Sequence, residues 1–208
     1  LPAGDGAVAA EPAARAALHV TGWGSWQPEK KVLAFEDLFP QIKKANTIQQ
    51  GVLRQLDHLQ EPFLLILEAP TGSGKTETAL CIADTFIQQH DLRGFYVAMP
   101  TQATSDQMFK RVKDYLQRRY PDELLNLQLA HGNALLEDDD EKIQLAGIAD
   151  ADDNPRSGVN ALSWFTPRKL TLLAPFGVGT VDQSLLSVLQ ARHFALRLFG
   201  LARKVIIF

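Results

Sequence analysis

Glu68-Ala-Pro-Thr-Gly-Ser-Gly-Lys-Thr-Glu77 is the stretch of this sequence that decides the fold. It follows the apolar run 63–67, which predicts a buried strand, and it precedes a segment whose apolar residues recur at helical spacing. Gly72 and Gly74 let the backbone turn its N–H groups inward, and a helix that begins near Lys75 adds the positive end of its dipole. The order of strand, glycine-rich loop and helix therefore predicts a loop that binds the phosphates of a nucleoside triphosphate.

Two side chains of this loop have separate predicted roles. Lys75 supplies a positive charge for the β- and γ-phosphates, and the hydroxyl of Thr76 is a hard oxygen ligand of the kind that Mg²⁺ prefers. The alternative is a solvated glycine turn that carries a lysine by chance. The predicted strand before the loop and the predicted helix after it favour the phosphate site.

Composition limits the class of protein. The 208 residues are enough for one α/β domain with a core and too few for two large ones. The apolar fraction of 46% and the charged fraction of 22% are those of an ordinary globular protein. Because the formal net charge is −3, no global positive field attracts a nucleic acid. Any nucleic-acid site must therefore be a local patch.

Cysteine content and hydropathy indicate the compartment. The single cysteine, Cys81, cannot form an internal disulfide, and its place on the helix after the loop favours a small core residue over a nucleophile. The longest apolar runs are about five residues, whereas a bilayer-spanning helix needs roughly twenty. We therefore expect a cytoplasmic protein with no membrane partner.

Both ends of the sequence are abrupt. Residues 1–6 lack an initiator methionine and a basic start, and the sequence stops inside the apolar run 205–208. We expect a fragment of a larger protein, in which residues 1–31 are a linker or the remnant of a preceding domain. Trp23 and Trp26 in that segment could stack on a base, but pinning the linker to the domain is the commoner role.

Strands and helices alternate along the rest of the chain. A strand–helix–strand unit of the length seen after the loop forces a parallel, right-handed crossover, so we expect a mainly parallel sheet with helices on both faces. The acidic, turn-rich stretch 137–158 predicts a surface insertion with solvated carboxylates rather than a metal site. The expected elements are a helix from Asn46 to about 59, a strand at 63–67, a helix from 75, a strand at 95–99, a helix around 108–116, a strand at 127–130, a strand and loop at 177–183, a helix at 184–195 and a strand at 205–208.

Three short motifs stand in a fixed order around the loop. Gln49 precedes it, Pro100-Thr-Gln102 follows the second expected strand, and Gly179-Thr-Val-Asp-Gln183 follows a later one. With alanine at position 69 the loop has the form A-x-T-G-x-G-K-T. This set resembles superfamily 2 helicases, and within them the helicase part of the CRISPR-associated helicase-nuclease of type I systems. The resemblance runs from about residue 26 to 208 and is most specific over 172–186.

The resemblance implies that residues 32–208 are the first RecA-like helicase domain, an α/β P-loop fold that stops before the Asp-Glu-x-His box of that family. It implies ATP and Mg²⁺ as cofactors and single-stranded DNA as a partner. It also implies a second RecA-like domain, a nuclease domain and a CRISPR RNA-guided surveillance complex as further partners. Since hydrolysis needs an acid and arginines from across the cleft, the fragment is expected to bind ATP but to hydrolyse it poorly.

The same resemblance assigns residues to the two sites. Gln49 would read the adenine edge, and the strand-end loops would lie along the single strand. The expected nucleotide-binding residues are Gln49, Thr71, Gly72, Ser73, Gly74, Lys75 and Thr76, with Thr76 as the magnesium ligand. The expected nucleic-acid-binding residues are Pro100, Thr101, Gln102, Gly179, Thr180, Asp182 and Gln183. Further candidates for contacts to the nucleic-acid backbone are Arg168, Lys169, Arg192, His193 and Arg197. Independently of the resemblance, His131 at the end of a predicted strand could contact nucleic acid, although a hydrogen bond to the protein backbone is the commoner role there.

Some alternatives remain open at this point. Thr180 or Asp182 could cap a helix instead of, or as well as, binding nucleic acid. A self-contained P-loop kinase or another NTPase would keep an acceptor-binding lid and an acid in the same domain, and the sequence shows neither an arginine-rich lid nor a strand-end acid. A non-catalytic interaction domain would keep the fold only. Binding of ATP with and without single-stranded DNA would separate these classes.

Overall fold

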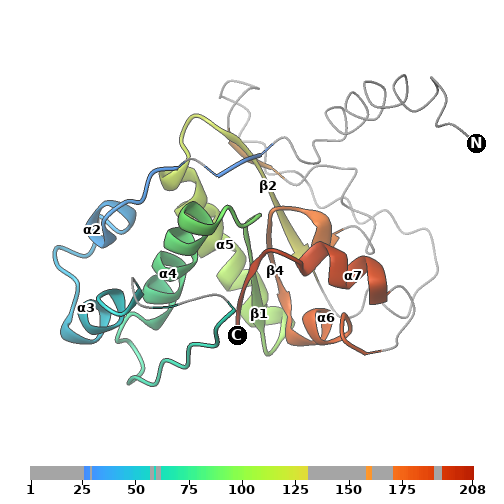
Figure 1. Ribbon diagram of the computed structural model, residues 1–208, viewed down its shortest axis with the longest axis horizontal. Helices are drawn as coiled ribbons and strands as arrows, with labels where there is room; N and C mark the ends of the chain where they lie inside the picture. The colour runs from blue at the N-terminus through green and yellow to red at the C-terminus, as the bar shows by residue number, and fades with distance from the viewer. Residues whose placement is uncertain are drawn as a thin grey trace, which may run out of the picture.

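A parallel β-sheet organises the part of the chain that the computed structural model describes, which is residues 26–28, 30–56, 59, 62–130, 158–160, 171–189 and 194–208 (Figure 1). Its five strands lie in the order β3-β2-β4-β1-β5, and every neighbouring pair is parallel. The strands are β1 (Phe95–Met99), β2 (Leu124–Ala130), β3 (Gly158–Asn160), β4 (Phe176–Thr180) and β5 (Val205–Ile207).

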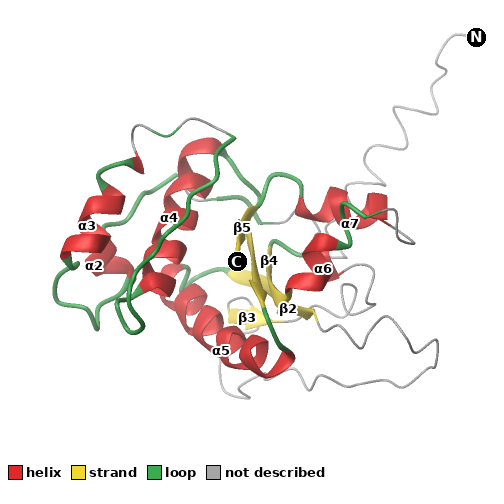
Figure 2. Ribbon diagram, turned by 90° about the horizontal axis from the view of Figure 1, so that it is seen from below, coloured by secondary structure: helices red, strands yellow, loops and turns green. Residues whose placement is uncertain are grey.

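Helices cover both faces of the sheet (Figure 2). One face, which carries Phe95 and Val97 of β1, packs against α4 (Lys75–His90) and α5 (Gln102–Arg119). The other face, which carries Tyr96 and Ala98, packs toward residues of the shorter helical segments. The remaining helical elements are α2 (Phe35–Leu38), α3 (Thr47–Leu53), the 3₁₀ turn η4 (Thr171–Leu173), α6 (Val181–Leu185) and α7 (Phe194–Leu201). The predicted α/β class with helices on both faces is confirmed.

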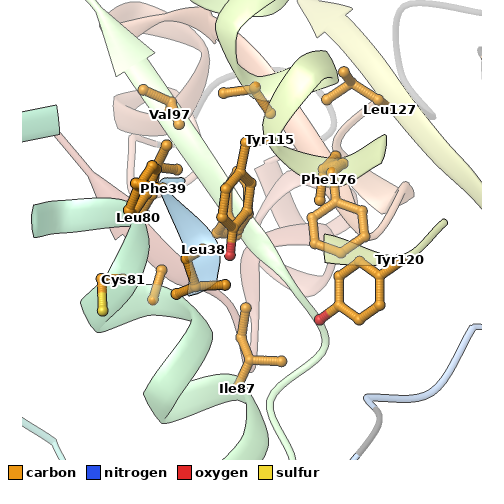
Figure 3. Close-up of a cluster of buried hydrophobic side chains, with 14 of the residues drawn as sticks. Leu38, Phe39, Leu80, Cys81, Ile87, Val97, Tyr115, Tyr120, Leu127 and Phe176 are labelled. Carbon is orange, nitrogen blue, oxygen red and sulfur yellow. The ribbon is translucent and has the colours of Figure 1, made fainter. Parts of the chain in front are cut away.

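The main core fills the space between the sheet and the helices α4 and α5, and it combines aliphatic with aromatic side chains (Figure 3). Trp26 joins this core, with its ring centroid 5.7 Å from that of Tyr120 and 4.8 Å from that of Phe176. The expectation that Trp26 pins its segment to the domain is therefore confirmed, whereas Trp23 lies outside the described residues. Cys81 is 2% exposed, and burial raises the pKa of its thiol to about 12, as expected of a core residue.

Residues 63–67 do not form the predicted strand. Their backbone makes no ladder hydrogen bonds, and Leu64 and Ile66 are 85% and 74% exposed. The segment lines a cavity of about 920 Å³ together with α4 and β5. In the described part of the chain β5 pairs only with β1, so its other edge carries no strand. The prediction of a strand is therefore wrong for this structure, in which residues 63–66 are exposed, because a strand needs a paired edge and this segment stands off the sheet.

Two predicted helices have different bounds in the structure. The helix capped by Asn46 ends at Leu53 rather than near residue 59. The chain changes to a tighter turn there, in which the N–H of Gln55 donates to the carbonyl of Val52, three residues earlier. The single helix expected at 184–195 is instead α6 and α7. The hydroxyls of Ser184 and Ser187 bond back to carbonyls three residues earlier, and the chain leaves α6 in turns. No described helix is long and apolar enough to cross a bilayer.

Candidate nucleotide and nucleic-acid site

The glycine-rich loop has the backbone geometry that the sequence predicted. Gly72 and Gly74 have φ angles of 79° and 81°, in the left-handed region that only glycine enters without steric cost. The N–H of Ser73 donates to the carbonyl of Pro70 at 3.3 Å and closes the turn. Helix α4 begins at Lys75, so the unpaired N–H groups of its first turn adjoin the loop.

Lys75 is held by the loop itself. Its Nζ donates to the carbonyl of Ala69 at 2.6 Å and to that of Pro70 at 3.0 Å. A phosphate in the loop would compete with these two carbonyls for the ammonium. Thr76 follows in the first turn and is half-buried. The described residues hold no group of three or more His, Cys, Asp or Glu side chains that could bind a metal.

The start of α3 is clamped to the loop. Asn46 and Gln49 form a reciprocal capping box, in which each side chain accepts from the backbone N–H of the other. The Asn46 amide also donates from Nδ2 to the carbonyl of Ser73 at 2.9 Å, and the Gln49 amide donates from Nε2 to that of Gly74 at 3.4 Å. The loop role of Asn46 was missed, although the Asn-x-x-Gln spacing is a visible signal for the cap.

Gln49 is 2% exposed, and both atoms of its amide are engaged in these contacts. An amide oxygen can accept two hydrogen bonds and an amide nitrogen can donate two. One acceptor position and one donor position therefore remain on the side chain, which is the pair that an adenine edge requires. A side chain at Gly74 would be strained because the φ angle of this residue is 81°, and its Cβ would also displace the Gln49 amide nitrogen.

The two strand-end loops lie next to each other. β1 and β4 are parallel neighbours, and Met99 stands opposite Thr180, so the chain leaves both strands at the same edge of the sheet. Thr101 caps α5 in a reciprocal box with Thr104. Pro100 and Thr101 are exposed and Gln102 is half-buried, so this loop is accessible to a ligand.

The second loop is largely buried. Gly179, Thr180 and Gln183 are all buried, and Asp182 is exposed in the first turn of α6. Thr180 occupies the N-cap position, but its side chain makes no capping bond, and its Oγ1 has no hydrogen-bond partner among the described residues. The alternative of a side-chain cap at Thr180 is therefore wrong in this structure.

Gly179 is required by packing. A Cβ there would collide with the carbonyl of Ala130 and the hydroxyl of Tyr96, and that hydroxyl donates to the carbonyl of Thr180 at 3.1 Å. Tyr96 also crosses Gly177, where a Cβ would lie 2.9 Å from its ring. Tyr96 is thus a positioning residue for the β4 loop. Sequence reasoning missed it because nothing local links position 96 to position 179.

Arg197 was expected to contact a nucleic-acid backbone from the surface, and the structure contradicts this. Its side chain is 5% exposed, and Nη1 donates to Oε1 of Gln183 at 2.8 Å. Burial lowers the pKa of its guanidinium. Arg197 therefore orients the side chain of Gln183 from within the protein interior instead of reaching solvent. The other candidates for backbone contacts, at positions 168, 169, 192 and 193, lie outside the described residues, as does His131.

Comparison with known proteins agrees with this geometry. The family model described as type III restriction enzyme, res subunit, matches residues 39–160. The chain belongs to this family of helicase domains. A CRISPR-associated endonuclease/helicase Cas3 of Thermus thermophilus is 40% identical over 195 residues, which are 93% of this chain and 21% of that protein. A CRISPR-associated nuclease/helicase Cas3 of Streptococcus thermophilus is 33% identical over 88% of this chain and 20% of its own length.

Solved structures show the same fold for the helicase domain. A crystal structure of T. fusca Cas3-ATP is 39% identical, covers 84% of this chain and 19% of that one, and superposes with a TM-score of 0.67. A crystal structure of a CRISPR-associated protein is 36% identical over 93% of this chain and 22% of that one, with a TM-score of 0.65. The RecA-like fold is thereby shown, and the chain spans about a fifth of the length of the curated relatives it matches.

Proposed function

We propose that this chain is the ATP-binding first RecA-like domain of an ATP-dependent single-stranded DNA helicase that acts in CRISPR antiviral defence. The observation that carries the proposal is the loop at residues 70–74, whose left-handed glycines and lysine lead directly into α4. The relatives named as Cas3 helicases and the solved structure with ATP support it. They favour a helicase over the alternative of a self-contained kinase or unrelated NTPase.

In this proposal the chain binds and orients the nucleotide. Lys75 exchanges the carbonyls of Ala69 and Pro70 for the β- and γ-phosphates, while N–H groups of the loop from Thr71 to Thr76 surround them. Bound Mg²⁺, with Thr76 as a ligand, would neutralise phosphate charge. Hydrolysis also needs an acid and arginines from a facing domain, so we propose that the 208-residue chain alone turns over ATP poorly.

The nucleic acid would pass over the exposed loop at the end of β1. Polar side chains and N–H groups there suit phosphate oxygens and carry no base code, so binding should be sequence-tolerant. Pro100, Thr101 and Gln102 are accessible in the structure. Gly179, Thr180 and Gln183 are buried beside them, and we propose that they support the loop that carries Asp182 until a local shift exposes the unpaired Thr180 Oγ1.

We expect Thr101→Asp to weaken binding of single-stranded DNA by about fivefold. Aspartate is an equally good N-cap, so α5 keeps its first turn, whereas the new charge repels a passing phosphate by roughly 1 kcal/mol in water. Thr101→Ser is the matched control, because it keeps both the cap and the hydroxyl. Fluorescence anisotropy with labelled oligothymidine at two salt concentrations measures the effect, which should shrink as salt rises. Equal affinities of the two variants at low salt would remove this loop from the DNA path.

Gln49→Ala is expected to reduce the affinity for both ATP and GTP, and to reduce that for ATP more. Loss of the bond to Gly74 loosens the loop for any triphosphate, by about two- to tenfold for one ordinary hydrogen bond. Loss of adenine contacts affects ATP alone. Titration calorimetry with both nucleotides separates the two contributions. An unchanged ATP/GTP ratio would contradict adenine recognition, and an unchanged GTP affinity would contradict the loop clamp.

The remaining partners also belong to this proposal. The names of the relatives suggest a nuclease domain in the same protein. We propose a CRISPR RNA-guided surveillance complex as the partner that recruits it. We propose a second RecA-like domain that closes over the nucleotide. The cytoplasmic location inferred from the sequence stays a prediction. Copurification of the complete polypeptide with a surveillance complex, compared with the same polypeptide carrying Lys75→Ala, would test whether nucleotide binding controls that association.

A further inference from the structure

A row of polar side chains joins α4 to α5, the two helices that begin at the two proposed sites. The two helices run side by side on one face of the sheet (Figures 1 and 2). On α5, positions 111, 115 and 119 are four residues apart and so share one face of the helix. We call this row the helix seam; its members are Glu77, Asp84 and Gln88 of α4, Arg111, Tyr115 and Arg119 of α5, and Tyr120 at the C-cap of α5.

The buried part of the helix seam is centred on Asp84. Its Oδ1 accepts from Nε of Arg119 at 2.8 Å and from the hydroxyl of Tyr115 at 3.1 Å, and both side chains of the ion pair are 2% exposed. Beyond it, Gln88 donates to the hydroxyl of Tyr120 at 3.0 Å. Charged groups buried in one geometry resist separation, so this part holds the two helices as one unit.

The exposed end of the helix seam is an ion pair close to the loops. Nη2 of Arg111 donates to Oε1 of Glu77 at 2.6 Å, and the side chains are 50% and 20% exposed. Glu77 stands in the first turn of α4, directly after the loop residues Lys75 and Thr76. Arg111 lies on the helix that begins with Gln102, at the proposed DNA loop.

These contacts connect the phosphate loop to the DNA loop through two helices. A phosphate that draws Lys75 away from the carbonyls of Ala69 and Pro70 acts on the first residue of α4. Glu77 lies in the same turn, and its ion pair with Arg111 joins that turn to α5. Because Thr101 caps α5, a movement of this helix moves the exposed loop. No direct hydrogen bond between the two loops is needed for this.

We propose that the helix seam couples nucleotide binding to DNA binding, with Glu77 and Arg111 as positioning residues at its adjustable end. The proposal rests on the function proposed above. Coupling is reciprocal, so single-stranded DNA raises the affinity for ATP by the same factor as ATP raises the affinity for DNA. An exposed ion pair contributes little to folding, which makes this end of the seam the one that can be altered without unfolding the domain.

The test measures the affinity of the complete polypeptide for a non-hydrolysable ATP analogue, with and without saturating oligothymidine. The ratio of the two affinities is the coupling factor. Arg111→Gln is expected to lower this factor about two- to fivefold while it changes either affinity alone by less than about twofold. Arg111→Lys should restore most of the factor. Lys110→Gln removes the same charge one position away, on an exposed side chain, and should leave the factor unchanged.

Each outcome decides between the proposals. Equal coupling factors for Arg111→Gln and Lys110→Gln would overturn the role of the helix seam. So would a wild-type polypeptide that binds both ligands with a coupling factor of one, although the proposed function would then stand. If the polypeptide bound neither ligand, the proposed function would fail, and the coupling with it. Thermal unfolding of each variant shows whether a lower coupling factor results from loss of the ion pair between Glu77 and Arg111 or from a destabilised fold.

Discussion

Replacing Lys75 with alanine is expected to weaken ATP binding at least tenfold. A hydrogen bond to a charged group contributes about 1.5–3 kcal/mol, and alanine removes the ammonium from the β- and γ-phosphates. AMP lacks those phosphates, so its affinity should hardly change, and it serves as the ligand control. Lys110→Ala removes a surface charge elsewhere and serves as the protein control.

The structure sharpens this expectation. Lys75 in the free loop already bonds to the carbonyls of Ala69 and Pro70, so its contacts with ATP replace existing ones, and the loss falls at the lower end of the range. Titration calorimetry with ATP and AMP gives the comparison. If Lys75→Ala changed the ATP affinity by less than twofold, the loop would not be the phosphate-binding site that the proposed function requires. A parallel loss of AMP affinity would indicate a distorted loop rather than a missing contact.

The elements that sequence predicted well are those specified locally. β1 was predicted with the bounds that the structure shows, and the buried residues of α5 include Met108, Val112, Tyr115 and Leu116, the expected stripe. The loop was predictable for the same reason, since two glycines at fixed spacing between a strand-like run and a helix leave few conformations open. Glycine permits the positive φ angles that this loop adopts, and the glycine spacing shows where they can occur.

Contacts between distant segments were not predictable from one sequence. Tyr96 and Gly179 meet only because β1 and β4 are neighbours in the sheet, and a strand pairing of that separation leaves no local pattern. Burial of Arg197 has the same origin, because its partner Gln183 lies in another helix. For residues 63–67, apolar composition predicted a strand, whereas the structure leaves most of these side chains exposed. Whether a strand forms depends on the facing edge of β5, which composition does not describe.

The contacts of Asp84 with a distant segment of the chain stabilise the fold, and substitution can measure how much they contribute. In sequence it is an acidic residue on an apolar helix, with nothing to mark it as essential. In the structure it faces Arg119 across 35 residues of chain, with a distance of 2.8 Å between Oδ1 and Nε. Asp84→Ala would leave the guanidinium of Arg119 buried without this counter-charge. Breaking a buried pair from one side costs roughly 3–5 kcal/mol, a large part of the ~5–15 kcal/mol that stabilises a typical protein.

We therefore expect Asp84→Ala to destabilise α4 and α5 strongly, and hydrogen exchange of the amides in both helices should lose at least about a hundredfold of protection. Glu77→Gln, which breaks only the half-exposed pair, should cost less than about 1 kcal/mol and is the matched control. The double variant Asp84→Leu with Arg119→Met removes both charges and should recover much of the loss, because an apolar pair of similar volume needs no counter-charge. Protection in Asp84→Ala equal to that in Glu77→Gln would contradict the buried ion pair. Failure of the double variant to recover would instead assign the stability to the other contacts of Arg119, such as its bond to the carbonyl of Lys31 at 2.7 Å.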